Sequence, residues 1–135
     1  MASEIGIGKS IDDDNPFIDD QRIILNDDGY YWHLYPYFEN AKIVQEYELI
    51  DLYGDCEVEG KELSNLEKQL YKCLNDIDKK NDTWKVLTGW REFKAEGNEI
   101  YHEVEKSKMV KLINQFHKFI SIAKDKNLKL ICIGD

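Results

Sequence analysis

Apolar residues recur every three and four positions in two stretches of the chain, which is the period of an α-helix. We predict one helix over residues 61–79 and a second over 107–126. Ser107 is expected to cap the second helix, and Asn127 is expected to end it in the left-handed conformation. The two apolar stripes consist of Leu63, Leu66, Leu70, Cys73, Leu74 and Ile77, and of Met109, Leu112, Ile113, Phe116, Phe119, Ile120 and Ala123.

Strand-forming residues dominate the chain between and after these helices. Residues 83–93 and 99–104 are rich in β-branched and aromatic side chains, and the turn residues 95–98 separate them. This pattern predicts a β-hairpin. Residues 128–133 are nearly all apolar, so we expect them to form a central strand of a sheet.

The first half of the chain has a less regular pattern. Residues 22–25 predict a short strand, which the turn residues 26–29 close. A short helix is expected over residues 33–42, provided that Pro36 lies in its first turn, where the missing N–H is tolerated. Residues 47–59 alternate in polarity around Gly54-Asp55 and predict two strands joined by a turn.

Together these elements predict an α+β fold: a mixed or antiparallel sheet with about three helices packed mainly on one face. We expect an irregular acidic arm over residues 1–20 and a single domain over 21–135. The chain shows no apolar run for a membrane span or a signal peptide, so a cytoplasmic location is expected. Cys56, Cys73 and Cys132 fit no disulfide framework and are expected to be buried thiols.

Charge narrows the choice of partner. The net charge is −9, and residues 11–28 and 46–62 each sum to −6. Such a surface would repel nucleic acid and attract a basic protein. The alternative is that the acidity serves solubility alone.

Motifs of catalysis or of metal and cofactor binding are incomplete. Gly8-Lys9-Ser10 matches the end of a phosphate-binding loop, but the earlier glycine and the preceding buried strand are missing from the pattern. The aspartate run that starts at Asp12 fails the later positions of a calcium-binding loop. We therefore predict no catalytic residue, cofactor or metal ligand, although an enzyme with an unrecognised carboxylate site stays as an alternative.

Aromatic and acidic side chains are mixed in residues 27–38 and 49–59. Aromatic residues serve as anchors in protein interfaces, and carboxylates guide a basic partner to them. The predicted contact residues are Asp51, Tyr53, Asp55, Glu57, Tyr30, Tyr31 and Trp90. This pattern favours a binding protein over an enzyme.

Three short motifs carry a resemblance to a known class of proteins. Residues 27–32 (Asp-Asp-Gly-Tyr-Tyr-Trp), residues 51–55 (Asp-Leu-Tyr-Gly-Asp) and the terminal Gly134-Asp135 resemble small acidic bacterial immunity proteins of polymorphic toxin and contact-dependent growth-inhibition systems. The resemblance implies a protein that binds and neutralises a cognate toxin domain, often a basic nuclease, by occlusion. The alternative is an intracellular regulatory module that binds another protein.

Overall fold

Nine elements of regular secondary structure occur in residues 2–42 and 50–134, which are the residues that the computed structural model describes. They form an α+β fold, as predicted, but the strands make two antiparallel sheets and not the single sheet that was expected. The strands are β1 (Ala2–Gly8), β2 (Ile23–Asn26), β3 (Cys56–Val58), β4 (Thr83–Trp90), β5 (Glu99–Glu105) and β6 (Lys129–Gly134). The helices are α1 (Gly29–Asn40), α2 (Lys61–Ile77) and α3 (Lys106–Lys126).

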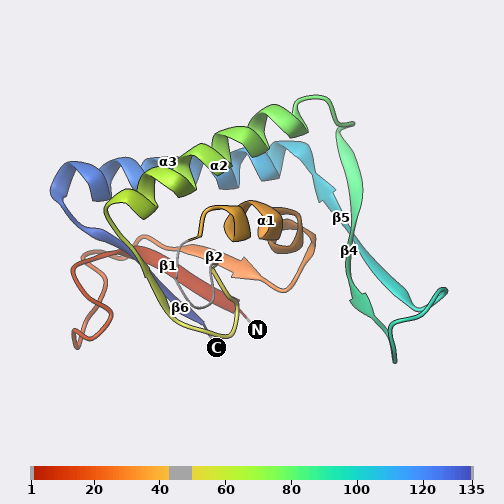
Figure 1. The fold of residues 1–135 in the computed structure, drawn as a ribbon, viewed down its shortest axis with the longest axis horizontal. Coiled ribbons are helices and arrows are strands. Elements are labelled where there is room, and N and C mark those ends of the chain that lie inside the picture. The colour runs from red at the N-terminus through yellow and green to blue at the C-terminus, as the bar shows by residue number, and fades with distance from the viewer. Residues whose placement is uncertain (1, 43–49, 135) are drawn as a thin grey trace.

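Four strands form the main sheet in the order β2-β1-β6-β3, and every neighbouring pair is antiparallel. Helices α2 and α3 lie side by side along the long axis of the molecule (Figure 1). Helix α3 packs on β1, β2 and β6 of the main sheet, and α1 packs against α2, β2 and the hairpin strands β4 and β5. Alternate residues of each strand point into the core, as shown by the fully buried Ile5, Ile23 and Leu130. The prediction that the last strand is central is confirmed, because β6 has a partner on each side.

The helical periodicity located α2 and α3 correctly, since both predicted stripes supply the buried residues of these helices. Asn127 ends α3 with φ 56° and ψ 46°, the predicted left-handed conformation. The prediction for Ser107 is wrong: α3 begins one residue earlier, after Glu105. Tight coupling to β5 explains this start, because the strand runs directly into the helix and the Lys106 N–H donates to the Asp82 carbonyl oxygen.

Helix α1 begins four residues earlier than predicted. The Asp28 carboxylate accepts hydrogen bonds from the N–H groups of Tyr30 and Tyr31, at 2.9 and 3.3 Å, and so caps the helix. Pro36 therefore lies inside α1 rather than in its first turn, which corrects the prediction. Pro36 has no N–H group, so the Trp32 carbonyl oxygen one turn earlier receives no helical hydrogen bond from it.

Strand β1 corrects the expectation of an irregular arm over residues 1–20. Residues 2–8 form β1, an interior strand of the main sheet. The glycines at positions 6 and 8 concealed this strand, because glycine is depleted in strands. Both glycines lie under the segment that follows: a Cβ at Gly6 would overlap the Phe17 ring, and one at Gly8 would overlap the Pro16 carbonyl oxygen.

Residues 9–22 thus cover part of the outer face of the main sheet, the face opposite the helices. Phe17 is buried, and the Arg22 guanidinium lies 3.6 Å from the centre of its ring. The Ile18 N–H donates to the Ile7 carbonyl oxygen at 2.8 Å. As a result Ile131, which lies on this outer face beside Gly6, is fully buried.

The hairpin β4–β5 is confirmed, but it forms a separate sheet that projects from one end of the molecule (Figure 1). Of the predicted strand–turn–strand over residues 47–59, positions 47–49 lie outside the described residues, and only Cys56–Val58 is a strand in the rest. The three cysteines are buried free thiols, as predicted. Within the described residues, no helix has the length and apolar character that a membrane crossing requires.

Candidate functional site

The two acidic segments of the sequence meet along strand β3. The Ile11 N–H donates a hydrogen bond to the Glu57 carboxylate at 3.0 Å, so the aspartate run that follows Ile11 continues the row of carboxylates on and around β3. Strand β3 is the outermost described strand on its side of the sheet. We call this surface the acidic edge and define it as Asp12, Asp13, Asp14, Asp51, Asp55, Glu57 and Glu59.

Hydrogen bonds fix the loop that precedes β3. The Asp51 carboxylate accepts from the Tyr53 N–H at 3.0 Å, which is the bond of an Asx-turn. The Asp55 carboxylate accepts from the Gly134 N–H at 3.0 Å. A Cβ at Gly134 would lie 2.6 Å from the Leu52 carbonyl oxygen, so only glycine permits this approach. Asp55 and Gly134, which come from two of the motifs in the resemblance, therefore hold the loop against the end of β6.

Lys129 partly neutralises the negative charge of the acidic edge. Its ammonium group lies 2.8 Å from the Glu59 carboxylate and 3.6 Å from the Glu57 carboxylate. The hydrogen bond to Glu59 raises the pKa of Lys129 above its ordinary value, so the lysine stays charged. These contacts give Glu57 a structural role, because it bridges β3, β6 and the segment after β1.

Tyr53 is one of the predicted aromatic contact residues, and its side chain is exposed beside the acidic edge. Its side chain is 53% exposed, and its backbone is fixed by Asp51. Leu52 and Ile50, on the same short loop, are fully buried and attach it to the core. An exposed tyrosine on a pinned loop loses little conformational freedom when it contacts a partner.

Tyr31 does not belong to any contact surface. It is 2% exposed, and its hydroxyl donates to the Ile50 carbonyl oxygen at 2.8 Å inside the core. The prediction that Tyr31 anchors a partner is therefore wrong. The sequence pattern alone could not separate this residue from its neighbours, because the face of α1 that points inward depends on where the helix begins.

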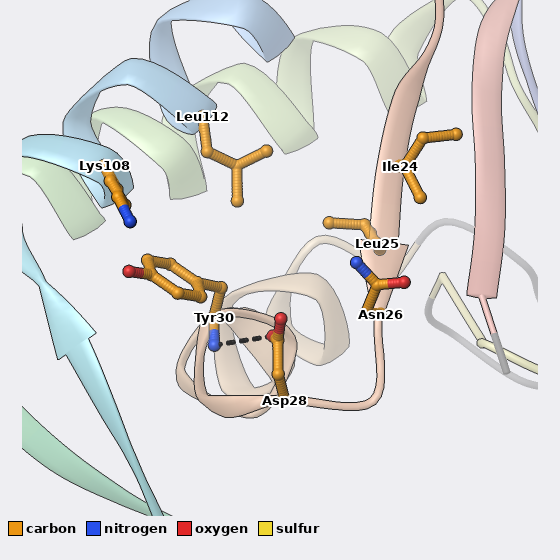
Figure 2. A pocket seen from close by; sticks show the side chains of 7 residues that line it. All are labelled: Ile24, Leu25, Asn26, Asp28, Tyr30, Lys108 and Leu112. Atoms are coloured by element: carbon orange, nitrogen blue, oxygen red, sulfur yellow. Dashed lines mark hydrogen bonds between the residues drawn. The ribbon is translucent and has the colours of Figure 1, made fainter.

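Tyr30 lies at a shallow hollow of about 190 Å³ between β2, α1 and α3 (Figure 2). Its hydroxyl accepts a hydrogen bond from the Glu105 N–H at 3.1 Å, which links α1 to the end of β5. Leu112 and Ile24 lie on opposite sides of the hollow, as Figure 2 shows. Tyr30 is half-buried here, so its first role is to join elements of the fold.

Trp90 lies on the hairpin, on a different surface from the acidic edge. Strict alternation would place Trp90 on the same face as Trp84 and Val86, which pack against the core. A register shift between Leu87 and Gly89 moves it to the other face, where it pairs with Glu99. We call Leu87, Trp90 and Tyr101 the hairpin outer face. Leu87 and Tyr101 are directly opposite each other and exposed.

Carboxylates with an altered pKa bear on the enzyme alternative. Burial raises the pKa of Glu62, which lies with Glu59 and Lys129 at a shallow hollow beside the start of α2. The Glu62 carboxylate accepts from the Glu59 N–H at 3.5 Å, across the first turn of α2. That contact explains the position of Glu62 structurally. No group of three or more potential metal ligands occurs in the described ranges 2–42 and 50–134.

Comparison with protein-family models, with curated proteins and with solved structures found no match, so the functional argument depends on this chain alone. The sequence predicted Tyr53 and the carboxylates around it as contact residues, and Tyr53 is exposed in the structure. It missed the contribution of Asp12–Asp14, because only the bond from Ile11 to Glu57 brings these residues to β3. It also missed the grouping of Trp90 with Tyr101, which depends on the bulge in β4.

Proposed function

We propose that this chain is a non-catalytic binding protein, an immunity protein that binds a cognate basic toxin domain and neutralises it by occluding its active site. The observation that supports this most directly is the bond from the Ile11 N–H to Glu57, which unites the two acidic segments into one edge. The resemblance to immunity proteins supports the same proposal.

The mechanism is competition for a cationic cleft. An enzyme that acts on nucleic acid holds phosphate groups with Lys and Arg side chains. The acidic edge offers carboxylates to the same groups, and long-range attraction accelerates the encounter. Tyr53 then contributes the desolvated contact that slows dissociation, which is where most differences in affinity arise.

The arrangement of the edge suits this role because several of its carboxylates are already positioned. Asp51, Asp55 and Glu57 each accept a backbone N–H within the protein. Groups held before binding lose less entropy on association, so a larger part of the interaction energy appears as affinity. Asp12, Asp13 and Asp14 are exposed and supply further negative charge.

The first experiment is growth rescue. The C-terminal domain of the large reading frame encoded immediately upstream would be expressed with and without this chain. We expect the domain to stop growth and the chain to restore it. Arrested growth that the chain does not restore, or an upstream domain without toxicity, would contradict the proposal for this pair.

The second experiment tests the acidic edge. Replacing Asp51, Asp55 and Glu57 would also disturb the fold, because each holds a backbone group. We therefore choose the triple variant Asp12→Asn, Asp13→Asn and Asp14→Asn. At low salt, this variant should associate with the toxin domain about tenfold more slowly than the wild-type chain does. Its association rate should also depend less on salt concentration.

The matched control removes the same charge from the other end of the molecule, by Glu92→Gln, Glu96→Gln and Glu103→Gln on the hairpin. These three residues are exposed. The control should associate almost as fast as the wild-type chain. If both variants slowed association equally, the net charge of the chain, and not the acidic edge, would control the association rate.

The third experiment tests the aromatic contact. Tyr53→Ala should raise the dissociation rate about thirtyfold, the effect of losing one hot-spot residue. Tyr101→Ala on the hairpin outer face is the control, since the two tyrosines are almost equally exposed, at 53% and 54%. A larger effect of Tyr101→Ala would move the interface to the hairpin.

A further inference from the structure

Two of the three buried thiols lie opposite each other in the main sheet. Cys56 of β3 and Cys132 of β6 are register partners in an antiparallel pair. Residues that are directly opposite in such a pair have Cα atoms roughly 4.5 or 5.5 Å apart, and a disulfide spans roughly 4.4 to 6.8 Å between Cα atoms. Both thiols are free and both point into the core side of the sheet.

We propose that Cys56 and Cys132 form a reversible cross-strand disulfide by exchange with a low-molecular-weight disulfide such as oxidised glutathione, and that this bond locks the acidic edge to the sheet. Cys73 provides the contrast within the same chain. It lies in α2 beside Tyr37 and Asp76, whereas Cys56 and Cys132 face each other across two strands.

Cys56 is the residue that an external disulfide would reach. It belongs to the outermost described strand on its side of the sheet and is 9% exposed, whereas Cys132 is fully buried in β6. The Cys56 thiolate attacks one sulfur of oxidised glutathione, and one reduced glutathione leaves. Cys132 then attacks the Cys56 sulfur of the mixed disulfide, and the second reduced glutathione leaves. Two protein thiols are oxidised, one disulfide is reduced, and the two thiol protons end on the two glutathione molecules.

The surroundings of Cys132 predict a slow second step at neutral pH. Its hydrogen bond to Cys56 and its burial hold the pKa of the Cys132 thiol well above its ordinary value, so little thiolate is present. The rate should therefore increase with pH. This dependence separates exchange at the buried pair from reaction at an exposed thiol.

The position of Cys56 and Cys132 determines what a disulfide between them would do to the acidic edge. Asp55 and Glu57 flank Cys56, and they already contact β6 through Gly134 and Lys129. A disulfide between these two contacts would keep β3 on the sheet when the edge opens locally. The effect on toxin binding depends on the proposed function, whereas formation of the bond does not.

The chemical test uses the reduced full-length chain. It would be incubated with oxidised glutathione, then alkylated under denaturing conditions and analysed by intact mass and peptide mapping. We expect one alkylated thiol, at Cys73, and a single peptide that links Cys56 to Cys132. Three alkylated thiols, a glutathione adduct that persists on Cys56, or a disulfide to Cys73 would each overturn the proposal.

Two variants keep the result interpretable. Cys73→Ala should leave the Cys56–Cys132 bond unchanged, and its loss in this variant would count against the proposal. Cys132→Ala should stop the reaction at the mixed disulfide on Cys56, with far-UV circular dichroism confirming that the variant folds. If this variant does not fold, Cys56→Ala on the outermost strand replaces it and should leave Cys132 without any adduct; an adduct there would overturn the assigned order of attack.

The conformational test compares the reduced and oxidised wild-type chains by hydrogen exchange. Amides of residues 56–58 should exchange at least about tenfold more slowly in the oxidised chain, because the bond suppresses local opening of β3. Equal exchange in the two forms would show that the bond does not lock the edge. If the lock forms and growth rescue still fails, the proposed function fails while the disulfide stands.

Discussion

The main sheet and the hairpin differ in whether another segment covers the face that points away from the helices. The main sheet packs its inner face under the helices, and residues 9–22 cover part of its outer face, so that Ile131 is fully buried there. The hairpin packs Trp84, Val86 and Val104 against the body, but its outer face leaves Leu87 and Tyr101 exposed. The same chain thus covers one outer face and leaves the other open.

The difference shows that apolar strand residues do not by themselves decide burial. Ile131 and Tyr101 both lie on the face of a sheet that points away from the helices. Ile131 is buried because two glycines beside it leave room for Pro16 and Phe17. No described segment covers Tyr101 in this way.

The largest expected effect comes from Gly8→Ala, which attacks the covered face. The new Cβ would overlap the Pro16 carbonyl oxygen, so the segment over the sheet must shift. We expect a loss of about 3 kcal/mol in the free energy of unfolding, measured by urea denaturation. Gly89→Ala in the hairpin is the matched control, since its Cβ would meet no described atom within 4 Å. Equal losses in the two variants would contradict the comparison.

Phe17→Ala removes the buried side chain of the covering segment and, unlike Gly8→Ala, introduces no steric overlap. Its ring lies against Gly6 and is largely buried, so its loss should cost about 2 kcal/mol of unfolding free energy. Ile18→Ala, the next residue along, is the control because Ile18 is exposed, and it should change stability by less than about 0.5 kcal/mol. Similar small effects for both variants would mean that the segment does not contribute to the core.

Tyr31→Phe separates a core residue from a contact residue. It removes the bond from the tyrosine hydroxyl to the Ile50 carbonyl oxygen, so we expect a loss of about 1 kcal/mol in stability. Tyr53→Phe should leave stability unchanged, since that side chain is exposed. A stability loss for Tyr53→Phe that matches the loss for Tyr31→Phe would refute this assignment.

Acidification should lower the free energy of unfolding through His33, a residue of α1 that contacts the hairpin. The His33 ring lies 5.2 Å from the Trp84 ring of β4, and burial, followed by the charge of Lys80, lowers its pKa. Since the folded pKa is below the unfolded value of about 6.5, the unfolded chain binds the proton first and stability falls as pH drops below that value. Urea midpoints from pH 7.5 to 5 should decrease less for His33→Gln than for the wild type. The control variant, measured under the same conditions, is His102→Gln at an exposed position of β5.

The smallest effect is expected on the open face. Leu87→Ser and Tyr101→Ser should each change the unfolding free energy by less than about 0.5 kcal/mol, because both side chains are exposed. Thermal denaturation would measure this. A loss above about 1 kcal/mol for either variant would show that the hairpin outer face packs against the protein itself.

Local pattern determined much of this fold. The apolar period defined α2 and α3, the turn residues 95–98 defined the hairpin, and the apolar run at the end of the chain defined β6 as a central strand. These features depend on neighbours within a few residues, which a sequence displays directly. The same holds for Asn127, whose side chain tolerates the left-handed conformation.

Long-range contacts decided the rest. Residues 2–8 became a strand because β2 and β6 pair with them, although two glycines hide the pattern. Tyr31 entered the core because Asp28 begins the helix early, and Trp90 changed faces because of one bulge. Asp12–Asp14 joined the carboxylates of β3 through a hydrogen bond that spans 46 positions. The sequence alone predicted an acidic α+β chain with candidate contact residues. Only the tertiary structure assembled the carboxylates among them into an edge and placed Tyr31 and Trp90 elsewhere, because burial and proximity arise from segments that are far apart in the chain.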